Sequence, residues 1–207
     1  MRAMWRLGLG FVRLETDMWV SLARALTRRP DTADGAPIRY AGAESPVLWA
    51  FLAVSAIEIP AVHFLIPWAP VRIVALVLGI WGVLLMLGMI AAHHVYPHVL
   101  TAERLRVRYL RRTRLDLPLA EVRAVHRDLS GYDGGKSVQL NGTTLAVVAG
   151  SSTNIRVDLT RPRTFVTPQG EFTTSIIAFW ADDPGAAVSA IRAEIAALRR
   201  TGAHDDR

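Results

Sequence analysis

Two apolar stretches follow one another almost without interruption, and they restrict this chain to few architectures. Residues 47–66 and residues 71–92 are 20 and 22 residues long and hold almost no charged groups. As α-helices rising about 1.5 Å per residue, each would cover a hydrocarbon core of about 30 Å. Only residues 67–70 join them, so the sequence predicts an antiparallel transmembrane hairpin within residues 46–94. The alternative is a pair of buried helices in a soluble protein, which a domain of this size rarely accommodates.

Arginines flank the hairpin on both sides and predict its orientation. Residues 1–45 carry seven arginines and residues 103–128 carry eight, whereas the link contributes only Arg72. Positive flanks stay in the cytoplasm, so we expect a multi-pass protein of the cytoplasmic (inner) membrane with both termini cytoplasmic and Trp68 outside.

The charge balance argues against a nucleic-acid partner. The net charge is +6, and its excess lies beside the predicted membrane segments, since residues 130–207 carry eight basic and eight acidic side chains. A high isoelectric point without a helix-turn-helix, an RNP-like motif or a zinc pattern is weak evidence for nucleic-acid binding. With no cysteine in the chain, there is neither a disulfide framework nor thiol chemistry.

The N-terminal segment, residues 1–29, shows helical periodicity with charged residues between its apolar positions. Trp5, Leu9, Val12 and Trp19 recur at helical spacing. Such a helix fits the headgroup region of the inner leaflet. A surface helix packed on the protein itself is an equally good interpretation. Residues 30–45, rich in Pro, Gly, Asp and Ala, are predicted to be a linker.

Residues 95–200 change to a period of two, which is typical of strands. Residues 104–109 and 112–117 alternate, with arginines opposite an apolar face. We name their arginines the basic strand pair: Arg104, Arg106, Arg108, Arg111, Arg112 and Arg114. Two interpretations remain open, a face that docks on anionic lipid or an acidic partner, and a merely solvated strand face.

Further strands and a closing helix are predicted after this pair. A short strand or turn is expected near Val125, and Asn141-Gly142 predicts a hairpin with a type I′ turn. Further strands are expected at residues 154–159, 164–167 and 172–180. Asp183-Pro184 then begins an amphipathic helix, and the tail, residues 201–207, is predicted to be disordered.

Several of these segments resemble bacterial pleckstrin-homology-like (PH-like) membrane proteins. The similarity lies in residues 96–108 (YPHVLTAERLRVR), residues 117–125 (LPLAEVRAV) and residues 177–184 (IAFWADDP), behind two helices. It covers about residues 46–200. The resemblance implies an α+β membrane protein, in which a transmembrane hairpin precedes a PH-like β-barrel or sandwich capped by a C-terminal α-helix. It also implies a binding or scaffolding role without catalysis. The lysine-rich phosphoinositide loop of the eukaryotic relatives is not present.

Two motifs could be mistaken for sites. Residues 130–137 (SGYDGGKS) nearly spell a phosphate-binding loop, but a strand pattern follows where the helix should begin, so a glycine-rich turn is the better interpretation. His93, His94 and His98 cluster near the membrane, but no carboxylate or cysteine completes a ligand set. We therefore expect no metal site and no cofactor.

Glu58 and His63 are the polar residues within the first apolar stretch. A charge near the bilayer centre costs at least about 2.5–3.5 kcal/mol, so Glu58 should be neutral, face another helix or line a wet cavity. His63 lies five residues on, about 140° around the helix, so the two do not form a dyad. Ala75, Gly79 and Gly82 form a stripe of small residues suited to close helix packing. Glu58 could be structural, or it could couple or handle protons.

Together these features predict a non-enzymatic, membrane-anchored binding or scaffolding module. Its expected partners are membrane lipids and either a membrane protein or a second copy of the chain. The alternative function is an accessory subunit of a membrane transport or channel assembly organised around Glu58. A membrane enzyme ranks last, because the sequence offers no nucleophile–base pair.

Overall fold

The chain is an α+β protein that divides into two compact units. The computed structural model describes residues 2–28, 31–32 and 35–205, with side chains from residue 14 to residue 201. The first unit comprises residues 1–30 and 44–95, and the second comprises residues 31–43 and 96–207. Residues 29 and 206–207, at the ends of the predicted N-terminal helix and tail, lie outside the described residues.

Three helices form the first unit: α1 (Arg2–Leu26), α2 (Ser45–Leu65) and α3 (Ala69–Val95). By length and composition, α2 and α3 are two helices long and apolar enough to cross a membrane. The prediction of two apolar helices is therefore confirmed. Their ends differ by a few residues from the predicted stretches, because α3 continues through His93 and His94 to Val95.

A stripe along α2 packs against α3 and leaves the rest of α2 exposed. The half-buried positions recur every three or four residues: Leu48, Leu52, Ser55, Ile59 and Val62. A Cβ atom at Gly79 would lie 2.8 Å from Cγ1 of Ile59, so the backbones approach closely there. A Cβ atom at Gly82 would meet nothing within 4 Å, so Gly82 lies outside the contact that the small-residue stripe predicted.

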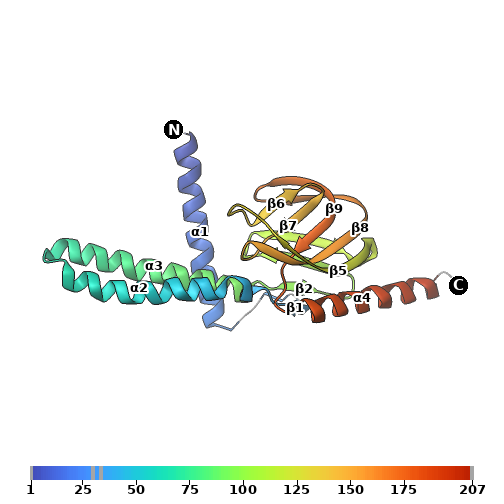
Figure 1. Ribbon diagram of the computed structural model, residues 1–207, viewed down its shortest axis with the longest axis horizontal. Helices are drawn as coiled ribbons and strands as arrows, with labels where there is room; N and C mark the ends of the chain where they lie inside the picture. The colour runs from blue at the N-terminus through green and yellow to red at the C-terminus, as the bar shows by residue number, and fades with distance from the viewer. Residues whose placement is uncertain (1, 29–30, 33–34, 206–207) are drawn as a thin grey trace. The chain divides into compact units, whose positions relative to one another are not determined.

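The helix α1 packs on the C-terminal half of α3. A Cβ atom at Gly88 would lie 2.7 Å from the carbonyl oxygen of Met18, so only glycine permits this approach. The indole Nε1–H of Trp81 donates to Glu15 Oε1 at 3.1 Å. Figure 1 shows α1 running across α3 rather than alongside it. Of the two interpretations of this segment, the structure shows packing on the protein itself.

Two β-sheets form the second unit. The first sheet has the order β1-β2-β3-β4, with β1 (Ala36–Ile38), β2 (His98–Leu100), β3 (Arg104–Tyr109) and β4 (Thr113–Pro118). The second has the order β5-β8-β9-β7-β6, with β5 (Val122–Gly131), β6 (Val138–Asn141), β7 (Thr144–Val147), β8 (Ser152–Thr167) and β9 (Gly170–Phe179). Short 3-10 helices occupy Ala41–Ala43 and Leu119–Glu121.

Most of the predicted linker, residues 30–45, belongs to the β unit, which includes residues 31–43. Strand β1 pairs with β2, with Ala36 opposite Leu100 and Ile38 opposite His98. Tyr40 is buried and stacks on the His98 ring with centroids 4.7 Å apart. The unit is thus assembled from chain on both sides of the α2–α3 hairpin.

One hydrophobic core lies between the two sheets and the C-terminal helix α4 (Pro184–Asp205). Leu105 and Leu117 contribute from the first sheet, Phe179 from the second and Ile191 from α4. The two sheets do not close into a barrel, so the barrel alternative of the predicted fold is wrong and two separate sheets are observed. The helix also continues to Asp205, where the sequence predicted a disordered tail from residue 201.

Helix α4 additionally covers the open edge of the second sheet. The side chain of Arg192 donates to the carbonyl oxygen of Val125 in the edge strand β5, from Nη2 at 2.6 Å and from Nε at 3.1 Å. Seven residues later, Arg199 donates to the carbonyl of Val122 at 3.4 Å. Two guanidinium groups thereby bind backbone carbonyl groups of the edge strand, which would otherwise be free to pair with a strand of another molecule.

The local geometry of two strands differs from the prediction. The segments predicted at residues 154–159 and 164–167 belong to one continuous strand, β8, with a register shift between them. The predicted hairpin joins β6 to β7, but Asn141 pairs with Thr144, which places Gly142 and Thr143 at its centre. Only Gly142 has a positive φ, at 58°, as in a type II′ turn rather than type I′.

His98 ties the two sheets together in the middle of the β unit. Its Nδ1 accepts the backbone N–H of Arg108 at 2.9 Å, and its Nε2–H donates to the carbonyl of Trp180 at 2.8 Å. The ring is therefore neutral, with the proton on Nε2. Burial lowers the pKa of His98 from 6.5 to about 4, against the opposing effect of the Trp180 carbonyl and with a further lowering by the charge of Arg108.

Candidate functional site

The basic strand pair is built by the register of β3 against β4. Arg106 lies opposite Asp116, and Arg108 lies opposite Arg114, so these side chains share the face that points away from the core. Leu105 and the other apolar residues of β3 fill the opposite face. The alternating pattern therefore sorts the charges correctly, but it does not reveal what each charge contacts.

Asp116 holds two of these arginines in a fixed arrangement. Arg106 Nε donates to Oδ1 of Asp116 at 2.8 Å, and Arg114 Nε donates to Oδ2 at 2.7 Å. Partial burial raises the pKa of the Asp116 carboxyl, but the hydrogen bonds and charges of the two arginines outweigh it and hold the pKa below its usual value. Asp116 is thus an anion at neutral pH, and it offsets one of the two positive charges.

Arg108 does not belong to an exposed basic face. Its side chain is 8% exposed, and its guanidinium donates to the carbonyl oxygen of Asp31 at 2.8 Å and to the Asp31 carboxylate at 3.2 Å. Buried arginines require such a partner, since an unpaired buried charge is costly. Arg108 is therefore a structural residue that fastens the chain before the hairpin to β3, and its assignment to the docking face is corrected.

The remaining arginines of the strand pair are exposed. Arg104 lies at the start of β3, while Arg111 and Arg112 lie in the turn between β3 and β4. That turn begins at Leu110, which has a φ of 53° and whose backbone N–H donates to the Tyr40 hydroxyl at 2.8 Å.

Without Arg108, the strand pair keeps four exposed arginines, Arg104, Arg111, Arg112 and Arg114, together with the half-buried Arg106. Arg106 and Arg114 share the single carboxylate of Asp116, whereas Arg111 and Arg112 make contacts of their own.

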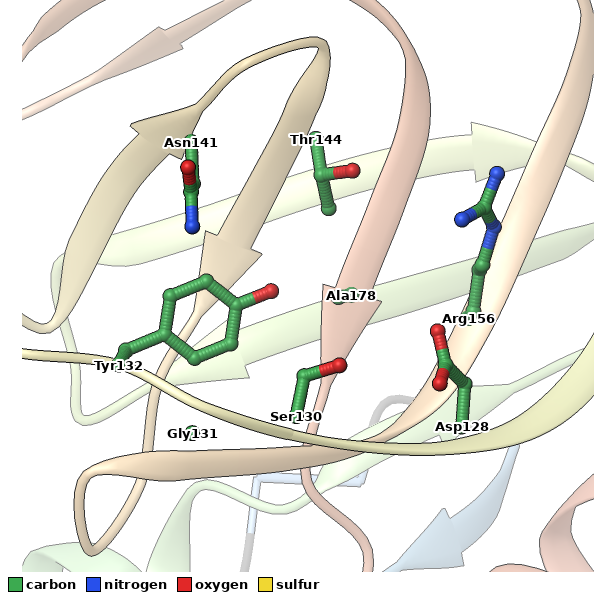
Figure 2. Close-up of a pocket in the computed structure, with 8 residues that line it drawn as sticks. All are labelled: Asp128, Ser130, Gly131, Tyr132, Asn141, Thr144, Arg156 and Ala178. Carbon is green, nitrogen blue, oxygen red and sulfur yellow. The ribbon is translucent and has the colours of Figure 1, made fainter.

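A second candidate is a polar hollow of about 400 Å³ on the outer face of the five-stranded sheet. Figure 2 shows Arg156 and Ala178 on neighbouring strands of the sheet, with the chain of Ser130 and Tyr132 crossing in front of them. The hollow is lined by hydroxyl, amide, carboxylate and guanidinium side chains around a small apolar floor: Asp128, Ser130, Gly131, Tyr132, Asn141, Thr144, Arg156 and Ala178.

The charges of this hollow are largely compensated. Arg156 Nε donates to Oδ1 of Asp158 at 3.0 Å, and His126 Nε2 lies 3.4 Å from the other carboxylate oxygen. Asp128 contributes a carboxylate to the lining itself. Such a lining suits a small neutral, hydroxyl-rich molecule more than an anion. The sequence signal nearest to it was the glycine-rich segment of residues 130–137. Ser130 and Gly131 end strand β5, and residues 132–137 connect it to strand β6 without a helix.

The three histidines considered as metal ligands have separate roles. His93 Nδ1–H donates to the carbonyl of Met89 at 2.9 Å, and its Nε2 lies 2.9 Å from the Glu44 carboxylate. His94 Nδ1–H donates to the carbonyl of Ile90, and His98 is engaged within the β unit. Within the described part of the chain, no three His, Cys, Asp or Glu side chains gather as metal ligands.

Glu58 and His63 are both exposed on α2 and do not face α3. Glu58 is one residue before Ile59, which touches Gly79 of α3, so the carboxyl points about 100° away from that contact. The ring of His63 lies edge-on to Phe64, with centroids 5.6 Å apart. Glu58 is therefore not buried between α2 and α3. The sequence alone did not determine on which side of α2 it lies relative to α3.

Comparison with family models, with curated proteins and with solved structures finds no match for this chain.

Proposed function

We propose that this chain is a non-enzymatic binding module anchored in the cytoplasmic membrane by the α2–α3 hairpin, with its β unit, a PH-like domain, on the cytoplasmic side. The pairing of β1 with β2 is the observation that carries the proposal. Ala36 and Leu100 are partners in one sheet, although the whole hairpin lies between them in the sequence. Both ends of the hairpin must therefore emerge on the same side of any membrane that it enters.

The exposed surface of the first unit supports insertion into lipid. Large apolar side chains are exposed along α2 and the first half of α3, among them Phe51, Ile57, Phe64, Ile73 and Val77. A soluble monomer rarely exposes an apolar patch of this extent. The helix α1 crosses the C-terminal half of α3, the half that leads into β2 (Figure 1). In the proposed topology this half lies at the inner leaflet, where an in-plane helix is expected.

The exposed arginines of the basic strand pair support docking on an anionic surface. Each basic residue close to an anionic leaflet contributes about 1 kcal/mol, and the attraction falls off within a Debye length. Arg106 and Arg114 share the one carboxylate of Asp116, which leaves a positive surplus on this face. We propose anionic lipid headgroups as the occupant, and an acidic protein surface is the alternative that the experiment separates.

The test uses the full chain in nanodiscs with and without anionic lipid. Because the chain has no cysteine, a single Ala120→Cys variant next to β4 can carry a dye, and energy transfer to a lipid dye reports docking. Anionic lipid should bring the dye closer, and Arg106→Gln with Arg114→Gln should weaken this by about 2 kcal/mol.

Arg200→Gln on the exposed end of α4 removes one arginine elsewhere and should change little. Lipid docking would be contradicted if the energy transfer were the same with and without anionic lipid, or if the double replacement and high salt left it unchanged. An acidic protein would then be the expected partner of the same face.

A further inference from the structure

Glu58 lies in the middle of an exposed seam that runs along the full length of α2. The seam residues are spaced alternately by four and three positions, and all are exposed: Val47, Phe51, Val54, Glu58, Ala61 and Leu65. This spacing keeps side chains on one side of a helix, as in the contact surface of paired helices. We call these six residues the Glu58 seam.

The seam is uncovered from end to end. Val54, one turn before Glu58, is 51% exposed, and Leu65 is 77% exposed. Phe51 remains 59% exposed even though α1 packs on the neighbouring part of α3. Among the described residues, no hydrogen bond or ion pair involves the Glu58 side chain.

We propose that the Glu58 seam is the contact surface between two copies of this chain, with the two Glu58 carboxyl groups bonded to each other across a twofold axis along the membrane normal. The proposal rests on the membrane insertion proposed above. In a hydrocarbon environment a carboxyl group avoids the cost of charge in its neutral form.

A neutral carboxyl carries one donor and one acceptor, so it is complementary to itself. A twofold interface brings each residue against its own copy, which is the geometry that such a group requires. A single polar residue within an apolar helix seam also fixes the register of the pair. A second copy therefore satisfies Glu58 without any further polar residue, whereas a different partner must supply one.

Cysteine cross-linking in native membranes tests the proposal directly, since the chain has no cysteine of its own. Val54→Cys and Ala61→Cys place a thiol on the seam, one turn to either side of Glu58. Ser55→Cys is the matched control, because Ser55 lies on the stripe that packs against α3. Under copper–phenanthroline oxidation the seam variants should form a species of twice 22.8 kDa, and the control should form several-fold less.

Replacement of Glu58 tests the role of the carboxyl within the same assay. Glu58→Gln keeps a group that can pair with itself and should preserve the cross-link. Glu58→Leu keeps the apolar volume but removes the hydrogen bonds, and it should weaken association about tenfold, equivalent to about 1.4 kcal/mol. The measurement is repeated at decreasing protein-to-lipid ratios. The weaker association then appears as a roughly tenfold higher protein concentration needed to cross-link half of the chains.

The outcomes separate this proposal from the function on which it rests. Extraction of the wild-type chain by alkaline carbonate would contradict membrane insertion itself. If the chain stays in the membrane, three results would overturn the seam. These are equal cross-linking at Val54 and Ser55, an unchanged result with Glu58→Leu, and a product whose mass shows a different protein.

Discussion

The two units of this chain treat the same kind of side chain in opposite ways. In the β unit, Phe179 is 0% exposed and packs between the two sheets and α4. In the hairpin, Phe64 is 85% exposed, and none of the residues of α2 is buried. One sequence therefore contains a closed apolar core and a long exposed apolar surface. This difference is what the membrane insertion proposed above predicts, with water around one unit and lipid around the other.

Polar groups show the same contrast. In the β unit, buried Asn154 exchanges two hydrogen bonds with the backbone of Ala181, at 2.7 Å and 2.8 Å, and buried His98 uses both of its nitrogens. The β unit thus satisfies these interior polar groups from its own chain. The hairpin leaves Glu58 exposed on its apolar surface, so the hydrogen-bond partners of its carboxyl group must come from what surrounds the protein.

Two phenylalanine replacements give the largest test of this comparison. Phe179→Ala should destabilise the β unit by about 3–5 kcal/mol, because it opens a cavity in a closed core. Phe64→Ala should leave the stability of the β unit unchanged within about 0.5 kcal/mol, since this exposed side chain belongs to the other unit. Urea denaturation in detergent, followed by circular dichroism of the sheets, measures both. Similar losses in the two variants would contradict the division into separately stabilised units.

Acid should weaken the β unit through His98. The folded pKa of about 4 lies below the unfolded value of 6.5, so the unfolded state binds the extra proton first. This contribution to stability is complete above about pH 6.5 and is lost as the pH falls toward 4, to a total of about 3 kcal/mol. Nuclear magnetic resonance of the imidazole and denaturation across this range measure it.

His126→Gln is the control, because it removes a histidine that is half-exposed and lies outside the core. A His98 ring that titrates near 6.5 in the folded protein would show that the buried arrangement is wrong.

Local patterns predicted the local elements of both units. Continuous hydrophobicity gave α2 and α3, alternation gave β3 and β4, and Asp183-Pro184 gave the start of α4. These signals lie within a few residues of the structure that they specify, so they can be interpreted without knowing the rest of the fold.

The pairings between distant segments could not be predicted in this way. Strand β1 is three residues long inside a Pro- and Gly-rich segment, and its partner Leu100 lies beyond the hairpin. The parallel pairing of β7 with β9 has no local signal either. The same limit explains Arg108, whose partner Asp31 is 77 residues away, and the polar hollow, whose lining comes from five strands and a loop.

A glycine pair on α3 provides the smallest and most specific test, because it asks what holds the first unit together. Helices in lipid gain little from hydrophobic burial and associate through close backbone contact at small residues. A Cβ atom at Gly88 would lie 2.7 Å from the carbonyl oxygen of Met18, whereas one at Gly82 would meet nothing within 4 Å. Gly88→Leu should therefore weaken the packing of α1 on α3 by about 1–3 kcal/mol.

Gly82→Leu makes the same chemical change on the same helix and should leave α1 in place. Trypsin cleavage after Arg24, near the end of α1, reports the release of this helix in detergent or nanodiscs. Faster cleavage in the Gly88 variant alone would show that steric fit, and not apolar area, decides the contact. Equal protection in both variants would mean that α1 is held by the bilayer rather than by α3, and the contrast between the units would then extend to this helix as well.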